Sequence, residues 1–119
     1  MKNKKKVIDL TYLKEVAQGD EQFMKHMIEL FIKQIPTNIK NAEEALAEKK
    51  PENFKQIIHK MKLPLATMGL SNAGKIVDTI NQNILQPDFY EQVPLLLEEI
   101  KNICNDAIVE LEEFMKQSG

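Results

Sequence analysis

One stretch of the sequence combines a histidine with lysines at helical spacing. His59 has Lys55 one turn before it and Lys62 one turn after it, and Ala66 follows two turns on. Residues three or four apart share one face of a helix. A neutral imidazole is a nucleophile near pH 7, because the ordinary pKa of histidine, about 6.5, leaves much of it unprotonated. A lysine can attract phosphoryl oxygens, so these residue types suit the receipt of a phosphoryl group.

A neighbouring apolar stripe predicts the helix that must position these residues. Its members recur at steps of four and three, the pattern of a helix that buries one face: Phe54, Ile58, Met61, Leu65 and Met68. We expect His59 just beside this buried face, where the backbone is held and the ring stays reachable. Taken alone, however, a single helical histidine is more often structural than functional.

Composition limits what the chain can be. Its 119 residues suit one domain, and the formal charge of -2 argues against a broad nucleic-acid surface. With 43% hydrophobic residues, no Trp and four glycines, it favours helices throughout. The single cysteine, Cys104, cannot form an internal disulfide.

The first six residues are basic but lack the apolar segment of a secretory signal. We expect a flexible tail at residues 1–6 and a single helical domain at residues 7–119. No stretch approaches the roughly 20 apolar residues of a membrane-spanning helix. A cytoplasmic domain that neither spans a membrane nor binds nucleic acid is therefore expected.

Helical periodicity predicts one short helix and four long ones. The short helix falls within residues 7–16, with Thr11 or Asp9 as N-cap, on the apolar residues Ile8, Leu10, Leu13 and Val16. The long helices are expected at about residues 21–49, 51–69 and 71–85, and from a start near residues 88–94 to about residue 116. The expected fold is all-α, an antiparallel up-down four-helix bundle with a short additional N-terminal helix.

Polar residues and prolines mark the predicted helix boundaries. Asp20 and Ser71 are suited to be N-caps, and Pro51 to a first helical position. Pro36 and Pro64 lie inside predicted helices, but the apolar stripe continues in phase across each of them. We therefore expect a kink at these prolines rather than the end of a helix.

Several kinds of site are disfavoured. The only histidines, His26 and His59, have no His or Cys at ligand spacing, and Cys104 lies on an apolar stripe, so we expect no metal site. His26 is expected to be a partly buried or surface residue. The carboxylates lie mostly on polar faces, and neither a Gly-rich phosphate loop nor a nucleophile motif occurs. An independent enzyme is therefore not expected.

The run HKMK at residues 59–62, followed by Ala66 and then MGL at 68–70, resembles a known motif. It is similar to that of the histidine-containing phosphotransfer (HPt) domains of multistep two-component signalling, which have His, any residue, an apolar residue and Lys, then apolar-Gly-apolar. Three further segments also resemble HPt sequences: residues 8–10, 19–20 and 30–36. The resemblance covers nearly the whole chain.

The resemblance implies a phosphoryl carrier without catalytic activity of its own. His59 would be the phospho-accepting residue and Lys62 would support the phosphoryl group. The implied partners are response-regulator receiver domains and a hybrid sensor histidine kinase, with Mg²⁺ in the receiver and no cofactor in this chain. We expect docking around Lys55, Leu63 and Ala66, with help from the helix at residues 21–49, and a monomer.

One residue departs from the family pattern. HPt sequences usually have Gly directly after the motif lysine, whereas this chain has Leu63, followed by Pro64. A bulky apolar residue there could obstruct docking or supply part of an apolar docking patch. Two alternatives stay open: a helical protein-interaction (scaffolding) domain that is never phosphorylated, and an HPt-derived domain that docks receivers but transfers poorly.

Overall fold

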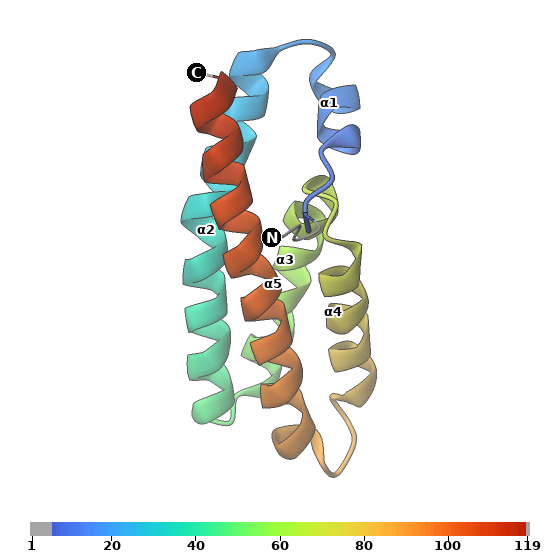
Figure 1. The fold of residues 1–119 in the computed structure, drawn as a ribbon. Coiled ribbons are helices and arrows are strands. Elements are labelled where there is room, and N and C mark those ends of the chain that lie inside the picture. Colours follow the sequence, from blue (N-terminus) through green and yellow to red (C-terminus); the bar gives the residue numbers. More distant parts are fainter. Residues whose placement is uncertain (1–5, 119) are drawn as a thin grey trace, which may run out of the picture.

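The computed structural model describes residues 6–118, which form five helices. These are α1 (Thr11–Ala17), α2 (Glu21–Ala47), α3 (Pro51–Thr67), α4 (Ser71–Asn83) and α5 (Phe89–Ser118) (Figure 1). The described residues contain no strand, so the predicted all-α class is confirmed. Of the predicted basic tail at residues 1–6, only Lys6 lies within the described residues.

The four long helices lie side by side. Helix α2 packs against α3, α3 against α4, α4 against α5, and α5 against α2, while α1 contacts α2. Figure 1 shows that successive long helices run in opposite directions and are joined by short links. None of the helices in residues 6–118 combines the length and the apolar character that crossing a bilayer requires.

The apolar stripe predicted at residues 54–68 forms part of the core, together with apolar stripes on α2 and α5. In α3 all of Phe54, Ile58, Met61 and Leu65 are fully buried, and α2 buries Ile28, Phe31, Ile35, Ile39 and Ala42. Helix α5 contributes Val93, Leu97, Ile100, Cys104, Ala107 and Leu111. Both α2 and α3 continue through their internal prolines, because packing of the stripe outweighs the lost backbone hydrogen bond.

Some predicted boundaries are confirmed and others are wrong. Asp20 caps α2, since its carboxylate accepts a hydrogen bond from the Phe23 N–H at 3.0 Å, and Pro51 occupies the first turn of α3. Ser71 is the first helical residue of α4 and not its cap, which is Leu70. Helix α2 ends at Ala47, two residues before the predicted end.

The short helix differs most from its prediction. It begins at Thr11, and Leu10 takes the cap position without a side-chain hydrogen bond, although the Asp9 carboxylate accepts from the Thr11 N–H at 3.0 Å. Val16, expected in the apolar stripe, is exposed, and Ala17 is buried instead. Residues 7–10 precede the helix as a non-helical segment, and the inward face of the helix runs from Leu13 to Ala17, four residues on, so that Val16 falls beside it.

Candidate functional site

The outward face of α3 carries the predicted site residues. The ring of His59 is exposed, and so are the side chains of Lys55 and Ala66, one and two turns away. Because the neighbouring Ile58 is fully buried, the backbone that carries His59 is anchored in the core. A rotation of about 100° per residue then places the imidazole at the edge of the outward face. The histidine is thus both firmly positioned and accessible.

Lys62 is turned toward α4. Its ammonium lies 2.7 Å from Oδ1 of Asp78, and about half of each side chain is exposed to solvent. A half-exposed pair of this kind contributes about 0–1 kcal/mol to stability. The pair therefore matters mainly because it positions the ammonium of Lys62, the residue that the HPt resemblance assigns to support of the phosphoryl group.

Sequence reasoning did not single out Asp78. A signal was nevertheless present, because α3 and α4 are antiparallel neighbours whose connection is centred near Leu70. Lys62 lies eight residues before Leu70 and Asp78 lies eight residues after it. Two helices of equal rise that turn back on each other bring residues equidistant from the turn to the same level. This count places the carboxylate opposite the lysine.

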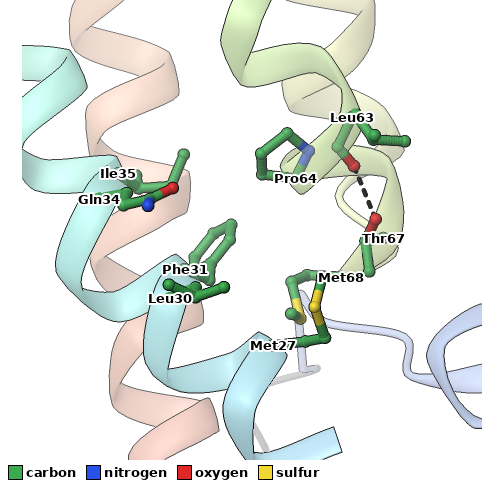
Figure 2. A pocket seen from close by; sticks show the side chains of 9 residues that line it. All are labelled: Met27, Leu30, Phe31, Gln34, Ile35, Leu63, Pro64, Thr67 and Met68. Atoms are coloured by element: carbon green, nitrogen blue, oxygen red, sulfur yellow. Dashed lines mark hydrogen bonds between the residues drawn. The ribbon is translucent and has the colours of Figure 1, made fainter. Parts of the chain in front are cut away.

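An apolar groove lies beside the exposed face of α3, where α2 packs against it. Figure 2 shows the lining, with Leu63, Pro64 and Thr67 on one side and Met27, Leu30, Phe31, Gln34 and Ile35 on the other, and Met68 at one end. The cavity measures about 130 Å³. Leu63, the residue that departs from the HPt pattern, forms part of its rim and is 70% exposed.

The local backbone of α3 explains the shape of this rim. Pro64 has no N–H, so it leaves the carbonyl of Lys60 without its usual helical partner. One turn later the Thr67 hydroxyl donates to the Leu63 carbonyl at 2.8 Å, and Thr67 is buried. The hydroxyl is satisfied within its own helix, which leaves its methyl group available for the groove.

Helix α3 ends in a motif that requires glycine. The Leu70 N–H donates to the Leu65 carbonyl at 2.9 Å and the Gly69 N–H donates to the Ala66 carbonyl at 3.0 Å. Gly69 has a φ of +74°, the left-handed conformation that this type of helix end uses. The apolar-Gly-apolar part of the motif thus has a structural role in ending the helix that carries His59.

The remaining sequence candidates take no part in this site. His26 is exposed on α2. Cys104 is fully buried on α5, and burial raises the pKa of its thiol to about 12. Within residues 6–118 we find no group of three or more His, Cys, Asp or Glu side chains placed to hold a metal ion.

Comparisons with protein-family models, with curated proteins and with solved structures found no match to this chain. The functional argument therefore depends on the residues themselves. The arrangement offers the accessible imidazole of His59, the lysines Lys55 and Lys62 one turn to either side of it, and an apolar groove that begins at Leu63, one turn away. Another macromolecule could reach the imidazole and the groove from the same side of α3.

Proposed function

We propose that this chain is a histidine phosphotransfer protein or domain of a multistep two-component phosphorelay. His59 accepts a phosphoryl group from the aspartate of a receiver domain and passes it to another receiver. In this proposal the four long helices are the antiparallel up-down bundle of an HPt domain, with α1 as the additional N-terminal helix. The chain is a carrier and not an independent enzyme.

The observation that carries the proposal is the exposure of the His59 ring on a helix whose opposite face is fully buried. A phosphoryl donor can approach such a ring without any rearrangement of the fold. Lys55 is exposed on the same face, and its positive charge favours the approach of an acidic partner surface. A histidine packed into the core and hydrogen-bonded there could not be reached by a phosphoryl donor.

The transfer step requires little from this chain except that it position the imidazole of His59. In the tautomer with its proton on Nδ1, the Nε2 lone pair of His59 attacks the phosphorus of the receiver's aspartyl phosphate. The N–P bond forms as the P–O bond breaks, and the electron pair of that bond leaves with the aspartate carboxylate. Catalysis of phosphoryl transfer is mostly positioning and charge neutralisation. The Mg²⁺ and acidic pocket are those of the receiver in this proposal.

The test is direct labelling. The full chain is incubated with a panel of purified receiver domains carrying radiolabelled aspartyl phosphate, and acid-labile label on the chain is measured. Label is expected on the parent protein and on His26→Gln, whose histidine is also exposed, but not on His59→Gln. Label that persists in His59→Gln would overturn the assignment.

The apolar groove supports a second candidate, a helical interaction domain that is never phosphorylated. An exposed leucine on the rim of an apolar groove is also what a protein-docking surface presents. The two candidates separate in one experiment. A receiver that binds the chain without labelling His59 would favour the interaction domain, or an HPt-derived domain that has lost transfer.

A further inference from the structure

Lys62 already has an anionic partner in the unphosphorylated protein. Its ammonium lies 2.7 Å from Oδ1 of Asp78 on α4. A phosphoryl group on His59 would form one helical turn from Lys62, where Cβ atoms are about 5–6 Å apart. The ammonium would then have two anions within reach, the phosphoryl group and the carboxylate of Asp78.

We propose that Asp78 is a positioning residue that competes with the phosphoryl group of phospho-His59 for Lys62. This inference rests on the proposed function, and it concerns how long the phosphoryl group is held. An ammonium has three donors and no acceptor, so each hydrogen bond to Asp78 is one fewer for the phosphoryl oxygens. Asp78 holds Lys62 toward α4 and leaves the phosphoryl group less completely neutralised.

Incomplete neutralisation favours release of the group over storage. A phosphoryl group carries about two negative charges and the carboxylate of Asp78 carries one, so both anions attract the ammonium of Lys62. The ammonium is then shared between them and does not leave Asp78 completely. Removing the charge of Asp78 frees Lys62 to stabilise phospho-His59. In a loose, metaphosphate-like transition state the phosphoryl oxygens carry less charge than in phospho-His59, so a lone lysine stabilises the phosphorylated ground state more than the transition state for attack by water. Hydrolysis then slows: water attacks the phosphorus, the N–P bond breaks with its electron pair returning to the imidazole, and phosphate is released.

The experiment uses phosphoramidate, so that it does not depend on any receiver. This small donor phosphorylates histidine as its own P–N bond breaks and ammonia leaves. The full chain carries His26→Gln in all samples, because His26 is exposed as well. Phosphorus NMR at pH 7 follows the decay of phospho-His59. Asp78→Asn is expected to lengthen its lifetime about two- to fivefold, the range that a half-exposed charge pair allows.

Three variants separate positioning from a general effect of charge. Asp78→Glu keeps the carboxylate and is expected to restore a lifetime close to the parent value. Glu113→Gln makes the same change in net charge at an exposed position of α5 and is expected to leave the lifetime unchanged. In a Lys62→Ala background, Asp78→Asn is expected to alter the lifetime by less than about 1.5-fold, because the lysine through which it acts is gone.

The inference is overturned if Asp78→Asn leaves the lifetime unchanged, if its effect is equally large in the Lys62→Ala background, or if phosphoramidate forms no phospho-His59. The proposed function fails on a different observation, the absence of label from receivers. If Asp78→Asn lengthens the lifetime of phospho-His59 formed from phosphoramidate but no receiver labels the chain, the role of Asp78 is supported and the proposed phosphorelay function is contradicted.

Discussion

Gly69 lies against the backbone of Asp9, sixty residues earlier in the chain. A Cβ atom on Gly69 would collide with the carbonyl oxygen and nitrogen of Asp9, and the Asp9 N–H donates to the neighbouring Met68 carbonyl at 3.0 Å. The segment before α1 therefore crosses directly over the end of α3. Glycine is required here twice, once for its positive φ and once for this close approach.

Gly69→Ala is expected to destabilise the protein by about 2–4 kcal/mol. Alanine in the left-handed conformation costs about 1–2 kcal/mol, and displacement of the Asp9 backbone adds to this. Urea unfolding monitored by circular dichroism measures the change. Gly74→Ala is the matched control, because a Cβ there meets no atom within 4 Å and the residue is helical. It is expected to stabilise by up to about 1 kcal/mol. Equal effects of the two substitutions would contradict this account.

Glu110 on α5 holds the same segment from the other side. Its carboxylate accepts hydrogen bonds from the Val7 N–H at 3.0 Å and the Ile8 N–H at 3.1 Å. Glu110→Ala is expected to cost about 1–2 kcal/mol, since both amides lose a charged acceptor. Amide hydrogen exchange at these two residues should accelerate, whereas Glu112→Ala, at an exposed position of the same helix, should leave it unchanged. Undiminished protection in Glu110→Ala would show that other contacts hold the segment.

The long helices were predictable because each one repeats its apolar residues at a constant spacing. The stripe from Phe54 to Met68 is buried as expected, and Pro64 does not interrupt it. The short helix was less predictable, since its few apolar residues do not distinguish a helix from an extended segment. Ile8 and Leu10 pack against the core from outside the helix, which a periodicity argument cannot anticipate.

The candidate site was predictable only along one helix. The spacing of Lys55, His59 and Lys62 on one stripe follows from helical geometry, and His59 is exposed as that geometry suggested. The partner of Lys62 depends on which helix lies beside α3 and where the chain turns, and the groove depends on α2 lying along its other side. The groove leaves no local pattern in the sequence, and counting from the turn at Leu70 finds Asp78 only once α4 is known to lie antiparallel beside α3.

Leu63 is the residue of the site whose role the resemblance leaves most open. It lines the groove between α2 and α3 (Figure 2). It lies one helical turn from His59, and 70% of it is exposed. An exposed leucine is free to be buried by a partner, and burial of such a side chain contributes about 1.5–3 kcal/mol. The groove behind it offers apolar contacts to the same partner. We therefore expect Leu63 to promote docking of a receiver and not to obstruct it.

Leu63→Ala is expected to raise the KM for transfer from a phosphorylated receiver by about five- to thirtyfold, because roughly 1–2 kcal/mol of apolar contact is lost. The free energy of unfolding should change by less than about 0.5 kcal/mol, since the side chain is mostly solvated. Leu95→Ala is the matched control, because Leu95 is 65% exposed on α5, away from the groove. It should leave the KM unchanged. Faster transfer in Leu63→Ala would contradict the prediction and show that the leucine obstructs the approach to His59.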